Sequence, residues 1–327
     1  MRQQAQVPSK RERGLGGRRL SFMPSRAPIL PSLAVLLLAA AGGAQQQSVG
    51  PPNPHPLEPQ KGNPYIRDGD SHYARRQEKR VGAAADKAEI AAAVRSYDTA
   101  AEAPDSVEAR WKLIRALVFQ ALYTDIDAQG RQAVLEKARR VSEDAVGLLE
   151  GRVKRAGGKE FASSTPAEIA EALRKDSDGP PTYYWAAVAW GQWALARGKE
   201  EATKLGAAEK IRSYASILIA LDPRFEEGGG FRVLGRLHDR APRMVSQTDW
   251  ISRDESLSNL RLAIQTEAGN FANRLFLAEA LASGSAAERS EAVRLAQQLV
   301  ADAPSPSRLV EDLRLQEEAA KDLRSWK

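Results

Sequence analysis

From about residue 83 onward, the sequence is a succession of amphipathic segments separated by proline and glycine. Apolar residues recur in each segment three or four positions apart, the spacing of one face of an α-helix. Proline cannot continue a helix and glycine weakens one, so the breakers between segments predict helix ends. They are Pro104, Gly130, Gly157-Gly158, Asp222-Pro223, Gly269-Asn270 and Pro304. Because valine, isoleucine and threonine are also too sparse for a sheet protein, the pattern predicts an all-α fold of antiparallel helix pairs.

The spacing of the breakers indicates a helical repeat. Pro223 and Asn270 lie 47 positions apart, whereas Asn270 and Pro304 lie 34 apart, and ~34 residues is the tetratricopeptide period. The longer interval contains a loop at 241–250. We therefore predict a degenerate tetratricopeptide-like solenoid over residues 83–327. Its predicted helices span 84–101, a segment from a cap at Asp105 or Ser106 to Leu122, 131–149, 166–175, 183–195, 204–221, 231–238, 256–266, 271–282, 287–301 and 307–326.

Residues 1–44 have the features of a secretory signal. A basic leader precedes the apolar run Ile29–Ala41, which is shorter than the ~20 residues that span a bilayer. Small residues then suit cleavage near Ala44, so we expect a periplasmic mature protein. An uncleaved N-terminal anchor is the alternative, and Met23 is an alternative start. No later stretch is long and apolar enough to predict a transmembrane span in the mature chain.

The charge and cysteine content exclude several classes of protein. The whole chain carries a net charge of +6. Residues 1–44 hold seven basic residues and one acidic residue, so the remainder is neutral and no nucleic-acid partner is expected. The absence of cysteine excludes disulfides, a cysteine nucleophile and an acylated lipoprotein N-terminus. Residues 45–82 are rich in proline and polar residues, which predicts a disordered linker.

No catalytic motif stands out in the sequence. The three histidines lack a neighbouring acid–base or nucleophile arrangement, and His238 is interpreted as structural. The run Gly228-Gly229-Gly230 follows a helix rather than a strand, so it predicts a tight turn between helices and not a phosphate loop. We therefore predict that the protein is not an enzyme and uses no cofactor.

One segment resembles a calcium-binding loop. Asp125, Asp127, Gln129 and Glu136 stand at positions one, three, five and twelve of the D-x-[DN]-x-[DN]-G-x₅-E pattern. However, Gln129 replaces an aspartate or asparagine, and no second loop is present to pair with this one. The alternative is a polar turn with Gly130 as a helix C-cap, and we predict no metal.

The segment from Tyr183 to Leu195 is apolar around nearly its whole circumference. A helix of this kind is buried between neighbours, which makes its aromatic residues core. In the alternative, one or two of these rings line a groove that binds an apolar ligand or a peptide.

Several blocks resemble the T-component of tripartite ATP-independent periplasmic (TRAP) transporters. The blocks are Glu108–Leu113, Tyr183–Lys199, Lys204–Gly206, Ala220–Pro223, Gly228–Leu237 with Ala241-Pro242, Ser252–Leu257 and Asn273–Leu281. The most specific of them is G-G-G-F-R-V-L-G-R-L at 228–237. This chain departs from well-known members in having no cysteine to acylate, and Arg243–Thr248 lacks their Gly/Pro-rich loop.

The resemblance implies a periplasmic, tetratricopeptide-like protein that associates with the transporter's solute-binding protein. It also implies that copies of the protein can associate around a ligand-conducting pore. The candidate ligand- or partner-binding residues are Tyr184, Trp185, Trp190, Trp193, Arg232 and Arg236. The expected function is accessory to TRAP-type solute uptake. A general scaffold for envelope complex assembly is the alternative.

Overall fold

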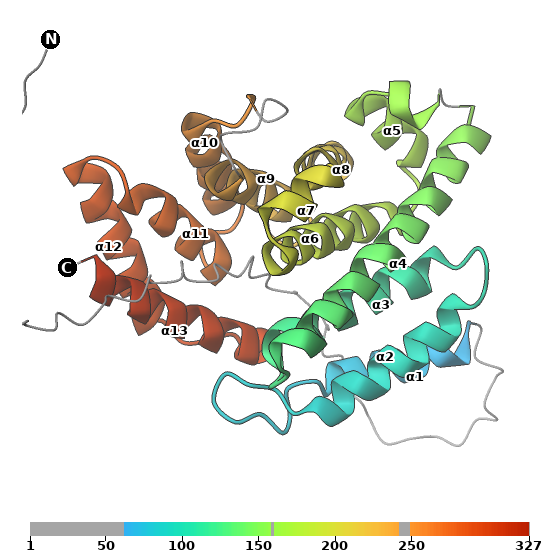
Figure 1. The fold of residues 1–327 in the computed structure, drawn as a ribbon, viewed down its shortest axis with the longest axis horizontal. Helices are drawn as coiled ribbons and strands as arrows, with labels where there is room; N and C mark the ends of the chain where they lie inside the picture. Colours follow the sequence, from blue (N-terminus) through green and yellow to red (C-terminus); the bar gives the residue numbers. More distant parts are fainter. Residues whose placement is uncertain (1–61, 158–159, 242–248, 327) are drawn as a thin grey trace, which may run out of the picture. The chain divides into compact units, whose positions relative to one another are not determined.

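The computed structural model describes residues 62–157, 160–241 and 249–326. Within these ranges the chain forms thirteen α-helices and no β-strand, which confirms the predicted all-α fold (Figure 1). The signal at 1–44, the first part of the predicted linker and the loop Arg243–Thr248 lie outside the described residues. No described helix is both long and apolar enough to cross a membrane.

The helices follow one another with short connections. Their bounds are α1 Pro64–Ala74, α2 Lys87–Ala101, α3 Val107–Tyr123, α4 Ala128–Arg155, α5 Pro166–Leu173, α6 Gly179–Arg197, α7 Lys199–Lys204, α8 Ala207–Leu221, α9 Gly229–Arg240, α10 Arg253–Thr266, α11 Phe271–Ala282, α12 Ala286–Ala301 and α13 Leu309–Ser325, with short 3₁₀ turns η1 at Phe161–Ser163 and η3 at Pro306–Arg308.

Side-chain caps begin most of the described helices, and the sequence predicts two of them, at Ser106 and Thr165. The Ser106 hydroxyl accepts a hydrogen bond from the Ala109 N–H at the start of α3. Thr165 and Glu168 form a reciprocal capping box at the start of α5, where Pro166 occupies the first helical position. These caps satisfy N–H groups that have no partner within the helix, so the local sequence sets the boundary.

Helix α1 corrects the predicted linker at 45–82. Asn63 caps it, and Pro64 occupies the first position, where a missing N–H costs nothing. The helix packs against α2, and Gly69 allows this contact because a Cβ there would lie 2.5 Å from the Tyr97 ring. The Tyr97 hydroxyl also donates to Asp70 at 2.7 Å. The prediction took Pro64 as a helix breaker, whereas it begins a helix.

The turn between α3 and α4 corrects a second prediction. Gly130 does not end a helix but lies in the first turn of α4, and its N–H donates to the Asp127 carboxylate at 2.7 Å. Asp127 is therefore the N-cap of α4. The helix is longer than predicted at both ends because its capping begins three residues earlier and its last turn continues to Arg155.

Neighbouring helices in the chain pack against each other in space. Contacts join α1 with α2, α3 with α4, α6 with α8, α9 with α10 and α11 with α12. Helix α6 also contacts α3, α4 and α9, and every residue from Pro181 to Trp193 is buried. This confirms that the segment apolar on all sides is enclosed by its neighbours.

The last helix returns to the first described part of the chain. Helix α13 contacts α11, α12 and α3, and Figure 1 shows it beside the lower end of α3. Arg76 and Glu311, both buried, form an ion pair at 2.9 Å, and Val310 N–H donates to Gln77. An open solenoid has contacts between neighbouring repeats only. The pairing of Arg76 with Glu311 adds a contact between the two ends of the helical series.

Candidate binding site

The block at 228–237 begins with an unusual backbone turn. Glu226, Glu227 and Gly228 all have positive φ, at 49°, 58° and 84°. Only glycine adopts this left-handed region without strain, so the two glutamates cost on the order of 1 kcal/mol each. A turn of this kind persists only where its surroundings hold it.

Arg232 holds the turn from the first coil of α9. Its side chain is fully buried, and both terminal nitrogens donate to the Glu226 carbonyl at 3.2 Å. The same guanidinium donates to the Asn273 side-chain oxygen on α11 at 2.8 Å and to the Tyr184 hydroxyl on α6 at 2.7 Å. Arg232 therefore joins three helices to one strained turn.

Two asparagines complete the support. The Asn273 amide donates to the carbonyls of Glu227, Ala263 and Glu267 at 2.9–3.0 Å. The Asn270 amide donates to the Glu227 carboxylate at 2.6 Å while its own oxygen caps α11. Because every one of these groups is buried or half-buried, each bond also avoids leaving a desolvated polar atom unpaired.

The glycines of this block let helices approach closely. A Cβ on Gly229 would lie 2.5 Å from the Tyr184 ring, and one on Gly230 would lie 2.7 Å from the Ile219 side chain. On the next turn, a Cβ on Gly235 would lie 2.6 Å from Leu260 on α10. The predicted tight turn is thus present at Gly228, while Gly229 and Gly230 belong to α9 and allow its packing on α6 and α8.

Arg236 lies one turn further along α9 in a separate polar cluster. It is fully buried, and one terminal nitrogen pairs with Glu279 on α11 and with Asp239. Its guanidinium also stacks 4.3 Å from the centre of the Phe276 ring. Two of its nitrogens, Nε and Nη2, have no hydrogen-bond partner among the described residues.

The carboxyl groups around Arg236 have divergent pKa values. Burial raises the pKa of Glu279, but the charges of Arg236 and Arg240 outweigh it, so this pKa lies below its usual range. On α13, burial and the nearby Glu279 charge raise the pKa of Glu318 to about 8 and that of Asp322 to about 6. The contact between α13 and α11 therefore contains carboxyl groups that titrate near neutral pH.

Trp190 and Trp193 form a different cluster with α4 and α8. Their rings meet edge to face at 5.4 Å, and the Trp193 indole N–H donates to Glu136 on α4 at 2.5 Å. Arg139 lies within 5.3 Å of the centres of both rings, and the Lys210 ammonium lies 4.7 Å from that of Trp190. The six candidate residues are thus divided among distinct groups of contacts.

Trp185 borders a small cavity rather than a ligand-sized one. Tyr73, Phe119 and Arg115 line the same space, whose volume is about 10 Å³. This volume is about that of one water molecule. Since Tyr184, Trp185, Trp190 and Trp193 are at most 3% exposed, their burial supports the core interpretation of the aromatic segment.

The residues of the calcium-like pattern have other roles. Asp127 caps α4, and Glu136 pairs with Arg139 at 2.8 Å as well as with Trp193. The hydrogen bond from Arg139 outweighs burial and lowers the pKa of Glu136. Asp125 and Gln129 are exposed. Within the described ranges, no group of three or more histidine, aspartate or glutamate side chains is placed to hold a metal ion.

His238 is a buried side chain at the end of α9. Its Nδ1 accepts a hydrogen bond from the Ser252 N–H at 3.2 Å, and its ring lies edge to face against Trp250 at 5.3 Å. Burial lowers its pKa, which favours the neutral ring that can accept this bond. The contacts agree with the structural interpretation of this histidine.

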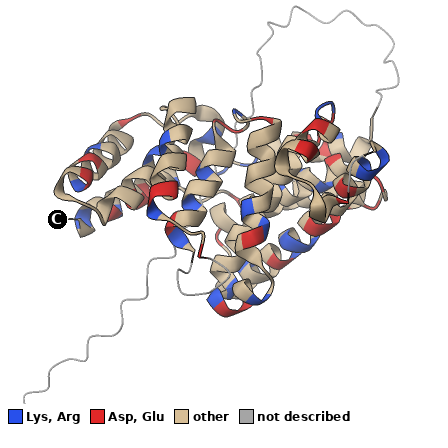
Figure 2. Ribbon diagram, turned by 90° about the horizontal axis from the view of Figure 1, so that it is seen from above, with Lys and Arg blue, Asp and Glu red and all other residues tan. Residues whose placement is uncertain are grey.

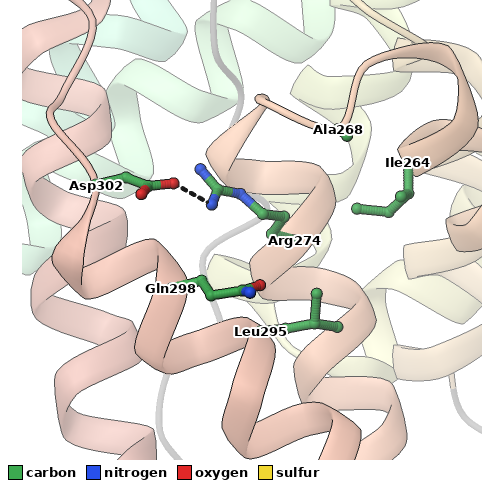
Figure 3. Close-up of a pocket in the computed structure, with 6 residues that line it drawn as sticks. All are labelled: Ile264, Ala268, Arg274, Leu295, Gln298 and Asp302. Atoms are coloured by element: carbon green, nitrogen blue, oxygen red, sulfur yellow. Dashed lines mark hydrogen bonds and ion pairs between the residues drawn. The ribbon is translucent and has the colours of Figure 1, made fainter.

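Two larger hollows lie elsewhere on the surface. One, of about 340 Å³, lies between α10, α11 and α12, and Figure 3 shows its Arg274 pointing toward Asp302. That arginine is already paired with Asp302 and donates to the Gly269 carbonyl, so its charge is satisfied internally. The other, of about 510 Å³, lies beside the N-terminal ends of α2 and α4 and is lined by several basic residues.

The sequence identified Arg232 and Arg236 but missed their partners. The sequence indicates Asn270 only as a helix stop, Asn273 only as part of a block that carries the family resemblance, and no role for Glu227. The available indication was Asn270 directly before an apolar helical segment, because asparagine is a preferred N-cap residue. Comparison of the sequence with models of known protein families and with curated proteins finds no match.

Proposed function

We propose that this protein is an exported helical interaction protein, accessory to TRAP-type solute uptake, which associates with a solute-binding protein. The observation that carries the proposal is the arrangement of the block at 228–237, in which Gly229, Gly230, Arg232 and Gly235 each have a specific packing or hydrogen-bonding role. These residues carry the resemblance to the T-component, and their roles are those of a helical scaffold.

A rigid helical scaffold suits recognition of another protein. Buried bonds from Arg232 and Asn273 fix the relative positions of α6, α9 and α11, so the surface of these helices is preorganised. Preorganisation reduces the entropy cost of association. In Figure 2, Lys and Arg are interspersed with Asp and Glu along the helices, which suits a protein partner better than nucleic acid.

Co-purification from the periplasm tests the proposal. The full chain, carrying a C-terminal affinity tag, is expressed in its native host and captured after gentle cell lysis. We expect a TRAP-type solute-binding protein in stoichiometric amount, and cross-linking is expected to reveal self-association. Recovery of an unrelated envelope complex without a solute-binding protein contradicts the proposal and favours the scaffold alternative.

The N-terminus of the recovered protein tests the proposed export. We expect a mature protein that begins near residue 45 in the periplasmic fraction. A full-length chain in the membrane fraction instead supports the uncleaved anchor. Mass spectrometry of the captured protein distinguishes these outcomes directly.

A further inference from the structure

The hollow of about 510 Å³ has basic side chains that converge from separate segments. Lys79 comes from the loop after α1, Lys87 from the first turn of α2, Arg131 from α4 and Arg314 from α13. Lys79 and Lys87 are near each other in the sequence, whereas Arg131 and Arg314 come from distant segments that the fold brings beside them. Two carboxylates, Asp86 and Asp125, also border the hollow.

Three of these cations have no carboxylate partner among the described residues. Arg314 pairs with Glu317 at 3.5 Å, whereas Lys79, Lys87 and Arg131 have no carboxylate within 4 Å in the described part of the chain. The Nε of Arg131 is moreover buried without a hydrogen-bond partner there. Asp86 is occupied as the N-cap of α2, since it accepts from the Ala88 N–H at 2.8 Å. The lining holds four basic side chains against two carboxylates, so the hollow has an excess of positive charge.

An exposed apolar residue stands at the rim of the same hollow. Val81 is 82% exposed, the highest value among the large apolar side chains described. Reciprocal backbone bonds with Ala84, at 2.8 and 3.0 Å, fix its position, and Arg80 donates to the Gly82 carbonyl at 3.0 Å. Ala85 is in turn bonded to Tyr123 at the end of α3. These backbone hydrogen bonds therefore fix Val81 in an exposed position.

The donors around the hollow distinguish a peptide from a free anion. Small anions are commonly bound by converging backbone N–H groups. Here the N–H groups of Ala84 and Ala85 donate to backbone carbonyls, and those of Ala88 and Gly130 donate to capping aspartates. These four N–H groups are therefore not available to an anion, and the hollow offers side-chain positive charge beside one exposed apolar residue. A polypeptide segment with carboxylates next to an apolar residue matches both.

We infer that this hollow, lined by Lys79, Val81, Lys87, Arg131 and Arg314, is a docking site for an acidic polypeptide segment that carries an apolar residue. The carboxylates of the segment pair with the basic side chains, and its apolar residue covers Val81. The inference does not depend on the proposed function, because it concerns the chemistry of the segment and not the identity of the protein that carries it.

Fluorescence anisotropy tests the site with a defined probe. The probe is a short fluorescein-labelled peptide of glutamates that flank a single leucine, added to the full mature protein at low ionic strength. Arg131→Gln and Val81→Ser are each expected to weaken binding by about tenfold. Neither substitution removes a side-chain bond within the described structure, so both variants are expected to fold, and circular dichroism checks this.

Arg155→Gln is the matched control. Arg155 lies at the other end of α4, on the order of 35 Å from Arg131 along the helix axis, and the substitution removes the same charge. Unchanged binding by this variant, with weakened binding by Arg131→Gln, supports the site. The inference is overturned if both variants weaken binding equally or if the wild type does not bind the peptide. It is also overturned if inorganic phosphate displaces the labelled peptide at a lower concentration than the unlabelled peptide does.

Discussion

The Arg308 guanidinium lies 2.7 Å from the Glu227 carboxylate, which precedes it by 81 residues. The pair joins η3, just before α13, to the strained turn before α9. Arg308 is only 8% exposed, so its charge has little access to water. The last helix is thus anchored at a backbone turn whose conformation Arg232 and Asn273 already hold.

Loss of the Glu227 carboxylate is expected to destabilise the protein. The substitution Glu227→Ala leaves Arg308 largely buried without its main partner and removes the bond from Asn270. We expect the free energy of unfolding to fall by about 2–4 kcal/mol. Urea denaturation measures the change, and adding Arg308→Met to Glu227→Ala is expected to restore part of it.

An exposed ion pair provides the comparison for this prediction. Arg314 and Glu317 lie 3.5 Å apart on the surface of α13, and Glu317→Ala is expected to change stability by less than about 1 kcal/mol. If both alanine variants show similarly small changes, Glu227 does not have the anchoring role that its contacts indicate.

Helix packing at Gly230 gives a second prediction. In Gly230→Ala the new Cβ would lie 2.7 Å from Ile219 and 3.3 Å from the Ala215 carbonyl, so α9 must shift from α8. We expect a loss of about 1–3 kcal/mol in the free energy of unfolding, measured by urea denaturation.

Gly147→Ala is the control for the Gly230 variant. Gly147 lies within α4, where a new Cβ meets no atom within 4 Å. The same substitution is expected to stabilise the protein here by about 0.5–1 kcal/mol, because alanine favours helix more than glycine. Opposite signs for the two variants support close packing at Gly230, whereas two stabilising changes contradict it.

Local sequence was sufficient to predict most helices. The caps at Ser106 and Thr165 act over three residues, so their effect is visible in the sequence itself. The same holds for the buried segment of α6, whose apolar residues cover its whole circumference. Proline is ambiguous in a sequence, because it ends a helix at most positions but is favoured at the first residue of one. Pro64 occupies the first residue of α1.

The polar networks were beyond local prediction. Glu227 meets Arg308 and Asn270 only because distant helices pack together, and nothing in the sequence near Glu227 indicates those partners. The left-handed conformation of Glu226 and Glu227 was equally hidden, since glutamate has no preference for it. For the candidate site, sequence singled out Arg232 and Arg236, but only the fold shows that both are buried.

Removal of α1 is expected to destabilise the helical body. A chain that begins at residue 83, as the predicted linker would permit, lacks the partner of Glu311 and the Asp70 acceptor of Tyr97. Glu311 is 1% exposed and would be left with an uncompensated charge. We expect a loss of several kcal/mol, seen as a lower midpoint in thermal denaturation. A chain that begins at residue 62 is the control and is expected to match the mature protein. Equal stability of the two truncated chains would show that α1 contributes little.

Glu318 is expected to make stability depend on pH. Its folded pKa of about 8 lies above the ordinary value, mainly because of burial and also because of the charge of Glu279. The folded state therefore holds this proton more tightly than the unfolded chain does. The stabilisation is complete below the unfolded pKa and is lost as pH rises from about 4.5 toward 8, with a slope of at most about 1.4 kcal/mol per pH unit.

The variant Glu318→Gln isolates this effect from other titrating groups. Glutamine has no proton to lose, so the difference in unfolding free energy between variant and wild type is expected to grow in favour of the variant between pH 5 and 8. Glu317→Gln, on the neighbouring exposed residue, is expected to give a difference that stays nearly constant with pH. Urea denaturation at several pH values measures both curves. Parallel curves for Glu318→Gln and wild type would mean that this carboxyl titrates as it does in the unfolded chain. The contact of α13 with α11 would then be more solvated than the burial of Glu318 indicates.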